Sequence, residues 1–384
     1  MNRLRIAILT HSINPRGGVV HALELAEALT DLGHDPVVHA PDAKGTGFFR
    51  PARCGVMSVE ATPFNGGMTE MVETRIADYV RHFERPGNRR FDVFHAQDGI
   101  SGNALATLKN RGFISRFART VHHIDDFSCA RLSALQHRAI VEADHHFTVS
   151  HMWQAELGER YGLAPVVVGN GVDIARFSPE RDGSEPALRT RLGLGAGPVI
   201  LSVGGIEARK NTLRLLEAFA QFHVLHPQAQ LVIAGGATVL DHEAYRTEFF
   251  ARLKALGLPA HAVIETGPLA QADMPTLYRL ADLLAFPSIK EGFGLVVLEA
   301  MASGVPVVVS HVAPFTEHLA DEDVVWCDPF HAGSIANAMA TALTPALAAR
   351  LRRRGPLTAR RHDWADTARA HVATYARLRE NAYA

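Results

Sequence analysis

The sequence predicts an α/β protein with two doubly wound parallel-sheet domains. Short apolar segments of strand length alternate with helical segments along the whole chain, and this alternation breaks once, near Asn170–Pro179. Strand–helix alternation of this kind is typical of parallel sheets that helices cover on both faces. A length of 384 residues fits two domains, since a domain usually contains roughly 100–200 residues.

The first half contains five strand-like segments and a clear first helix. The helix is expected over Val19–Leu32, where apolar residues recur at helical spacing and Gly33 ends the pattern. The expected strands are Leu4–Thr10, Asp35–Ala40, Phe91–Ala96, Phe117–His123 and His145–Ser150.

The second half repeats this organisation after a linker. Residues Val166–Pro186 lose periodicity and are rich in Gly, Asn, Asp and Pro. We therefore expect one domain over residues 1–170 and another over 171–363. The expected strands of the second domain are Pro198–Gly204, Gln230–Gly236, Val263–Gly267, Leu283–Ser288, Pro306–His311 and Val324–Pro329.

Composition excludes several classes of protein. The chain has 39 Lys and Arg and 40 Asp and Glu, so its net charge of −1 argues against nucleic-acid binding through an overall field. Its three cysteines are far apart, which excludes a disulfide framework or a cysteine zinc site and suits the cytoplasm. The N-terminal apolar run reads as a strand, not a secretion signal. No segment approaches the ~18 apolar residues of a membrane span.

Two strand-end loops carry signals for phosphate. Gly17 and Gly18 precede the first helix, and Arg209 and Lys210 follow the Gly-Gly end of the first strand in the second half. Glycines let a ligand approach the backbone, and helix starts and cations both favour anions. A flexible turn and solvated charges are the ordinary alternatives. The spacing is neither GxGxxG nor a Walker loop, so neither a nicotinamide cofactor nor nucleotide-triphosphate chemistry is indicated.

The segment Ser288–Ser310 places two glutamates around a glycine-containing helix start. Glu291 precedes "GFGL", and Glu299 follows within the expected helix. Carboxylates accept hydrogen bonds from hydroxyl groups, and free amides bind phosphate. This arrangement favours a nucleotide sugar. Helix capping would explain each glutamate separately but not the glycines between them.

His122, at the end of an expected strand, is a candidate hydrogen-bond donor to a sugar, although an ordinary turn histidine has the same pattern. The neighbouring Asp125 and Asp126 lack the Asp-x-Asp spacing of a metal motif. His145 and His146 alternate faces of a strand, so they do not share a metal. We therefore expect no metal site.

Motifs over nearly the whole chain resemble the retaining glycosyltransferases of family four, which have the two-domain GT-B fold. They include "NPRGGVVHALELAEAL", "RTVHHI", "VVGNGVDIARFSP", "LSVGGIEARKN", "LVIAGG", "GPLAQADMPTLYRLADLLAFPS" and "KEGFGLVVLEAMASGVPVVVS". The last contains the family's E-x7-E signature and is the most specific. Residues 364–384 are similar to the final helix, which packs back on the first domain.

The resemblance implies an enzyme (EC 2.4) that needs no cofactor or metal and transfers sugar from a nucleotide-diphosphate donor with retained anomeric configuration. It implies an acceptor-side first domain, a donor-binding second domain and a ligand in an interdomain cleft. It assigns His122 and Glu291 as catalytic residues. The residues that it implies for binding the diphosphate, sugar and ribose are Gly17, Gly18, Arg209, Lys210, Gly292, Phe293, Gly294, Leu295 and Glu299.

One position departs from the family pattern. Gly205 stands where members commonly have an arginine that pairs with the diphosphate, so Arg209 and Lys210 are expected to carry more of this role. A sugar-nucleotide epimerase, a phosphorylase and a non-catalytic sugar-nucleotide binder are the alternatives. A phosphorylase would need a longer chain with a pyridoxal-phosphate lysine.

The acceptor is not identified by any motif; a small molecule, a glycan and a lipid-linked sugar all remain open. Thr69–Arg90 reads as a basic amphipathic helix, and Arg350–Arg361 is also basic. Both fit peripheral contact with the inner face of a membrane, but a solvated basic face is the more common meaning of such patterns. The sequence gives no indication of the oligomeric state.

Overall fold

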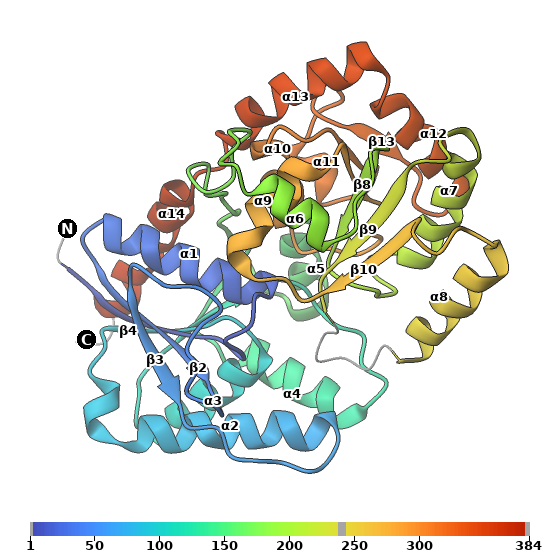
Figure 1. Ribbon diagram of the computed structural model, residues 1–384. Coiled ribbons are helices and arrows are strands. Elements are labelled where there is room, and N and C mark those ends of the chain that lie inside the picture. The colour runs from blue at the N-terminus through green and yellow to red at the C-terminus, as the bar shows by residue number, and fades with distance from the viewer. Residues whose placement is uncertain (1–2, 237–242, 381–384) are drawn as a thin grey trace. The chain divides into compact units, whose positions relative to one another are not determined.

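The structure is a computed structural model that describes residues 3–236 and 243–380 (Figure 1). The chain divides into two units. Unit 1 comprises Met1–Gly171 together with Asp363–Ala384, and unit 2 comprises Val172–His362. Each unit is described by itself below.

Unit 1 contains a seven-stranded sheet with the order β3-β2-β1-β4-β5-β6-β7. All of its strand pairs are parallel. The central strands are buried along most of their length because helices cover both faces. The strands are β1 (Arg5–Leu9), β2 (Asp35–Pro41), β3 (Gly55–Val59), β4 (Val93–Ala96), β5 (Ala118–Val121), β6 (His145–Thr148) and β7 (Val166–Val167).

Helices of unit 1 pack on the two faces of this sheet. The helices α2, α3 and α4 contact one another in sequence, and α1 lies beside the C-terminal helix α14 (Figure 1). Tyr79, Phe83 and Leu105 form a core with Leu9 and Phe94 of the sheet. The helices are α1 (Gly17–Asp31), α2 (Met68–Glu84), α3 (Gly99–Asn110), α4 (Ala130–Val141), α5 (His151–Tyr161) and α14 (Trp364–Glu380), with a 3₁₀ turn, η1, at Pro86–Arg89.

Unit 2 contains a six-stranded parallel sheet with the order β10-β9-β8-β11-β12-β13. Its strands are β8 (Val199–Val203), β9 (Gln230–Ala234), β10 (Val263–Gly267), β11 (Leu283–Phe286), β12 (Val307–Ser310) and β13 (Val325–Cys327). In both units the strand order reverses once, between β1 and β4 and between β8 and β11. Ligands of doubly wound sheets bind beyond the carboxyl ends of the strands at such reversals.

Helices α7, α8 and α12 build the largest described core of unit 2. Phe219, Phe249 and Met339 pack there against Leu231 and Leu283 of the sheet. The helices are α6 (Glu185–Arg191), α7 (Thr212–Leu225), α8 (Glu243–Leu256), α9 (Met274–Leu280), α10 (Leu295–Ala302), α11 (Phe315–His318), α12 (Ala332–Ala342) and α13 (Pro345–Ala359), with a 3₁₀ turn, η2, at Gln271–Asp273.

The predicted fold class is confirmed, and each predicted strand is present with ends that differ by a few residues. Two strands were missed. Four of the five residues of β3 are exposed because β3 lies at the sheet edge, so it lacks an apolar run. The two-residue β7 lies within the segment that we interpreted as aperiodic. The first helix begins at Gly17, two residues before the predicted Val19.

The basic segment predicted over Thr69–Arg90 forms α2 and η1. Arg75 and Arg81 of α2 both contact the carboxylate of Asp78, whose side chain is fully buried. These arginines therefore compensate an internal charge of unit 1. Among the helices that the structure describes, none is long and apolar enough to cross a bilayer.

Candidate functional site

Near the carboxyl ends of β8 and β11, the two predicted phosphate-binding cations of unit 2 both contact the carboxylate of Glu291. Lys210 donates to Glu291 Oε1 at 2.6 Å, and Arg209 donates to the same oxygen at 3.1 Å. Ser288 donates to this oxygen at 2.7 Å. The Nε atom of the same Arg209 guanidinium group lies 3.2 Å from Oε2 of Glu207. We call Glu207, Arg209, Lys210, Ser288 and Glu291 the strand-end cluster.

Three charged members of the strand-end cluster are buried, whereas the Arg209 side chain is 35% exposed. Lys210 is 7% exposed, Glu291 8% and Glu207 1%. Burial alone would raise the pKa of Glu291, but Lys210, Arg209 and Ser288 outweigh it and hold this pKa below the usual value. Burial lowers the pKa of Lys210, and the charge of Glu291 opposes that shift. Glu291 is therefore ionised at neutral pH, because charged donors surround it.

Lys210 reaches Glu291 because Gly204 has no side chain. A Cβ atom at Gly204 would lie 2.7 Å from Cε of Lys210, so the lysine stem passes directly over the glycine. The ammonium group then lies 4.4 Å from the ring centre of Phe286. This geometry adds a cation–π contact to the ion pair.

Gly205 does not have room for the arginine that the family commonly places there. Its φ angle is +78°, and a Cβ atom would lie 2.9 Å from the carbonyl oxygen of Gly236. An arginine at this position would strain the backbone and collide with the neighbouring strand end. Gly205→Arg is therefore not expected to add a diphosphate contact, whereas Arg209 already lies beside Lys210 on Glu291.

The predicted phosphate loop Gly292–Leu295 leads into α10. Gly294 is the N-cap residue of α10, and the helix has neither a side-chain cap nor an acidic residue in its first turn. Uncapped amides at a helix start attract anions. The Phe293 side chain stacks on His318 with ring centres 4.2 Å apart. Only the backbone of Phe293 is therefore suited to the predicted ligand contact.

Gly294→Ala is expected to destabilise unit 2. The φ angle of Gly294 is +100°, and an added Cβ atom would lie 2.5 Å from the fully buried ring of Phe315. Backbone strain of this kind costs about 1–3 kcal/mol, before any displacement of the ring. Thermal unfolding should show a lower unfolding temperature for Gly294→Ala than for the wild type. Gly99→Ala, at the start of α3 with no atom within 4 Å of its Cβ position, is the matched control; an equal loss in both variants would contradict the explanation.

Glu299 lies in α10 and has a partner that the sequence analysis missed. The hydroxyl of Tyr278, which is fully buried in α9, donates to Glu299 Oε2 at 2.7 Å. Burial raises the pKa of Glu299, while the bonds to Tyr278 and the charge of Arg176 oppose the rise. Tyr278 therefore orients the carboxylate and favours its ionised form.

Nucleoside binding is expected to weaken as pH falls if Glu299 holds ribose hydroxyls. The folded-state pKa of Glu299 is raised, so its carboxylate loses its charge and one oxygen becomes an O–H donor at a higher pH than for an ordinary glutamate. Tyr278→Phe removes a donor that opposes this shift, so the weakening should begin at a still higher pH. Calorimetric titration with a nucleoside diphosphate across pH measures this. The side chain in Glu299→Gln cannot titrate, so this variant should bind the nucleoside diphosphate more weakly and without the added dependence on acid. An identical pH profile in the wild type, Tyr278→Phe and Glu299→Gln would contradict the role of Glu299.

In unit 1, the ends of β1 and β5 bring His122 beside the glycine loop. A Cβ atom at Gly18 would lie 3.4 Å from Cδ2 of His122, so the ring packs against the start of α1. Gly17 has no atom within 4 Å of its Cβ position. Helix α1 also begins without a side-chain cap or an acidic residue in its first turn. Its first amides are therefore compatible with the predicted anion contact.

His122 has an amide neighbour at the end of the adjacent strand, and its pKa is shifted by burial. Its Nε2 atom lies 2.9 Å from Oε1 of Gln97, at the end of β4. Burial, with smaller contributions from His21, His123, Arg119 and His95, lowers the pKa of His122 well below its usual value. The ring is therefore neutral, so one of its two nitrogens can donate a hydrogen bond and the other can accept one.

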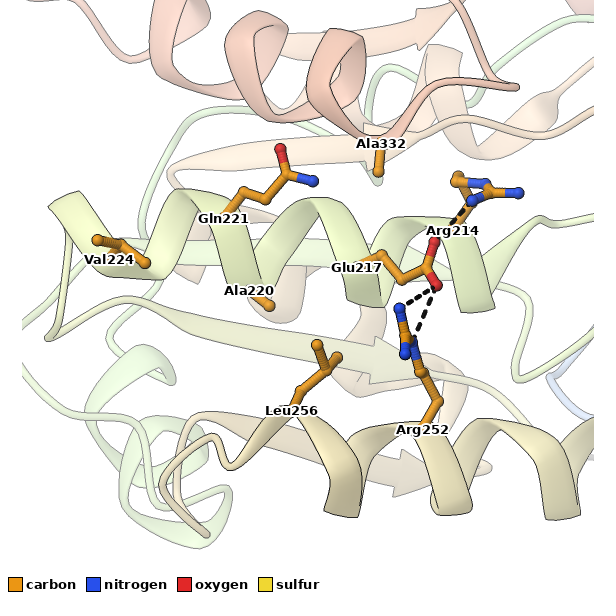
Figure 2. A pocket seen from close by; sticks show the side chains of 8 residues that line it. All are labelled: Arg214, Glu217, Ala220, Gln221, Val224, Arg252, Leu256 and Ala332. Carbon is orange, nitrogen blue, oxygen red and sulfur yellow. Dashed lines mark hydrogen bonds and ion pairs between the residues drawn. The ribbon is translucent and has the colours of Figure 1, made fainter.

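A surface hollow of unit 2 does not coincide with these strand ends. It lies along α7, α8 and the start of α12 (Figure 2). Glu217 in this hollow already pairs with Arg214 and Arg252. Glu217 thus engages both arginines of the hollow, and because the hollow lies away from the strand ends, we do not assign the donor to it.

Within residues 3–236 and 243–380 there is no group of three or more His, Cys, Asp or Glu side chains with metal-binding geometry. His146 contacts the carbonyl oxygen of Ile140 at 2.6 Å. The backbone of Asp125 is held by Gln136.

The sequence analysis missed Glu207, Ser288, Tyr278 and Gln97, which support the predicted residues. Ser288 stands three residues before Glu291, and Glu207 is close to Arg209, so their proximity was a usable signal. Tyr278 and Gln97 are far in sequence from Glu299 and His122, and only the fold brings them together.

Comparisons with known proteins show the family to which the chain belongs. The family model "Glycosyl transferases group 1" matches residues 185–358, and "Glycosyltransferase Family 4" matches residues 15–176. A D-inositol 3-phosphate glycosyltransferase of Acidothermus cellulolyticus is 31% identical over 308 residues, 74% of this chain and 67% of that protein. The corresponding protein of Salinispora arenicola is 30% identical over 256 residues, 60% of this chain and 56% of that protein. The chain spans about half the length of the first curated relatives that it matches.

A solved structure shows the same fold. Sucrose-phosphate synthase from Thermosynechococcus elongatus superposes with a TM-score of 0.80 at 22% identity, covering 98% of this chain and 99% of that one. Two Rossmann-like parallel-sheet units of this kind form the GT-B fold. The chain belongs to the glycosyltransferase family that the group 1 and family 4 models describe.

Proposed function

We propose that the protein transfers a sugar from a nucleotide-diphosphate sugar to a hydroxyl acceptor, retains the anomeric configuration and requires no metal ion. The observation that carries the proposal is the strand-end cluster, in which Arg209 and Lys210 share one oxygen of Glu291. This cluster lies at the strand reversal of unit 2, where doubly wound sheets bind ligands.

Unit 2 supplies groups that match the parts of such a donor. Arg209 and Lys210 provide positive charge for the diphosphate, and the uncapped start of α10 provides amides. Glu291 and Glu299 offer carboxylate oxygens to hydroxyls of the sugar and ribose. Glu207 has one buried oxygen with no hydrogen-bond partner among the described residues. A ligand hydroxyl would satisfy this oxygen.

Unit 1, considered by itself, offers the uncapped start of α1 at the glycine loop to an anion and His122 to a sugar hydroxyl. In the proposed reaction, the bond between the anomeric carbon and the leaving phosphate oxygen breaks, and the acceptor oxygen bonds to that carbon from the same face. The acceptor's proton passes to the departing phosphate oxygen, so the products are a glycoside and a nucleoside diphosphate. The positive charge beside Glu291 would stabilise the charge that develops on the phosphate.

The acceptor is proposed only as a hydroxyl compound. The two curated relatives described above carry names with a phosphorylated polyol acceptor, so phosphorylated polyols belong in the first panel to be tested. Simple sugars, glycans and lipid-linked sugars complete this panel. Activity only with lipid-linked acceptors would support contact with the membrane surface.

Calorimetric titration with UDP, GDP and ADP in the presence of EDTA tests the proposal. One of the three should bind with a single-site isotherm, and added magnesium or manganese should change neither this affinity nor the turnover of the matching sugar donor. No binding of any of them at millimolar concentration would refute the donor site. Turnover that EDTA abolishes and a metal restores would refute metal independence.

The competing functions give different outcomes in the same system. An epimerase converts the sugar nucleotide without releasing the nucleoside diphosphate. A non-catalytic binder shows the isotherm but leaves every donor intact, both alone and with the acceptor panel.

A further inference from the structure

Gln97 is a buried glutamine at the strand reversal of unit 1, and the activity described so far does not use it. It follows β4 directly, is 3% exposed, and its backbone amide donates to the carbonyl oxygen of Leu9 at 2.9 Å. The next residue, Asp98, caps α3 in a reciprocal arrangement with Ser101. The backbone of Gln97 is therefore fixed on both sides.

The amide of Gln97 lies between two histidine rings. Its Oε1 atom is 2.9 Å from Nε2 of His122, and its Nε2 atom is 3.4 Å from both ring nitrogens of His95. Equal distances to both nitrogens place the amide nitrogen against the face of the His95 ring. An N–H group is favoured at the electron-rich face of an aromatic ring, whereas a carbonyl oxygen is repelled there. The carbonyl oxygen of Gln97 consequently points to His122.

His95 itself is held in place from two elements. The hydroxyl of Tyr375, in the C-terminal helix α14, lies 2.7 Å from its Nδ1 atom, and Thr120 of β5 lies 2.8 Å from its Nε2 atom. Both His95 and Tyr375 are fully buried. The orientation of the Gln97 amide thus rests on a packed polar network and not on a mobile surface group.

We propose that Gln97 is a positioning residue that keeps the proton of His122 on Nε2 and leaves Nδ1 as a hydrogen-bond acceptor for a ligand hydroxyl. A carbonyl oxygen can only accept, so the His122 nitrogen that faces it must carry the proton. The Nδ1 atom of His122 makes no hydrogen bond with any other residue in the part of the chain that the structure describes. The identity of the hydroxyl as that of the transferred sugar rests on the proposed function.

The other groups around His122 do not replace Gln97 in this role. The ring of His21 meets His122 edge-on at 4.8 Å between centres, and its Nδ1 atom is engaged by Asn170 at 2.7 Å. Burial and the neighbouring His21, His123, Arg119 and His95 keep the ring neutral. A neutral ring has two tautomers, and Gln97 is the neighbour that distinguishes them.

Two-bond ¹H–¹⁵N correlation spectra of the ligand-free protein, labelled on histidine, test the proposal without any substrate. His122→Asn identifies the His122 signals by their loss. In the wild type, Nε2 should show the shift of a protonated nitrogen and Nδ1 that of an unprotonated one. A proton on Nδ1 in the wild type would overturn the proposal.

Gln97→Leu should leave the two nitrogens of His122 with averaged shifts, because neither tautomer is then selected. Gln136→Leu is the matched control, since Gln136 holds the nearby backbone of Asp125 through two hydrogen bonds but does not contact His122. The control should keep the wild-type shifts. Unchanged shifts in folded Gln97→Leu would overturn the proposal. If Gln97→Leu does not fold, Gln97→Glu provides the test. Its carboxylate should keep Nε2 of His122 protonated and should raise the pKa of His122. An unchanged pKa of His122 would contradict the contact between the two side chains.

Steady-state kinetics distinguish a positioning role of Gln97 from a purely structural one. With an active donor, Gln97→Leu should lower kcat about tenfold while the affinity for the nucleoside diphosphate stays within about twofold of the wild type, in line with a misplaced reacting group. In Gln97→Glu, activity should fall as pH decreases into the raised titration range of His122. An unchanged kcat in Gln97→Leu would remove its link to the reaction. The spectra report the tautomer of His122 even if no donor is turned over. Failure of the proposed function can therefore be distinguished from failure of the proposed role of Gln97.

Discussion

Lys210→Ala is expected to weaken nucleoside diphosphate binding by about 1.5–3 kcal/mol, the usual contribution of a charged hydrogen bond. This corresponds to roughly tenfold to hundredfold in Kd. The effect is large because Lys210 is 7% exposed and its side chain has a fixed position over Gly204 and Phe286. Arg209 remains on Glu291 in the variant, so the carboxylate keeps one cation. Calorimetry measures the change directly.

Lys254→Ala is the matched control, because this lysine is exposed on α8. It removes the same charge from unit 2 and should leave the Kd unchanged. A nucleoside monophosphate should lose less affinity than the diphosphate in Lys210→Ala if the lysine contacts the β-phosphate. Equal diphosphate affinity of the wild type and Lys210→Ala would place the phosphate site elsewhere.

His122→Ala is expected to lower kcat by about 10²-fold. The ring presents a hydrogen-bond acceptor from a fixed position between Gln97 and Gly18, and loss of such orientation of a reacting group has a cost of this size. Binding of the nucleoside diphosphate should change little, because the cations proposed to hold it lie in unit 2. Steady-state kinetics with the preferred donor, together with calorimetry, separates the two effects.

The neighbouring His123 provides the control for His122. It is exposed and lies 3.3 Å from the carboxylate of Asp125. His123→Ala should retain kcat within about twofold, since surface substitutions are usually close to neutral. A wild-type kcat in folded His122→Ala would make His122 a structural residue only.

The fold was predictable from the sequence because buried parallel strands leave a strong signal. Leu283–Phe286 is continuously apolar and Val199–Val203 contains one polar residue, Ser202, so their place in a sheet follows from composition and length. The edge strand Gly55–Val59 has no such signal, since most of its side chains face solvent.

The candidate site was predictable as a set of strand-end residues but not as a network. Gly-Gly turns and the motif around Glu291 marked the loops, yet their charges gave no indication that Lys210 and Arg209 share one carboxylate oxygen. The need for glycine at position 205 could not be predicted either. A side chain there would collide with the backbone of Gly236, which lies close only because β8 and β9 pair. The tautomer of His122 depends on Gln97, which lies on a neighbouring strand end.

Time-resolved ¹H NMR of the preferred sugar nucleotide in the presence of EDTA tests the central claim most directly. The proposal predicts that the nucleoside diphosphate is released and that the first sugar product has the anomeric configuration of the donor. Lys210→Ala should slow this release, and Lys254→Ala should not. A first product of opposite configuration, conversion of the sugar without release of the nucleoside diphosphate, or no turnover of any donor with the full acceptor panel would contradict the proposed function.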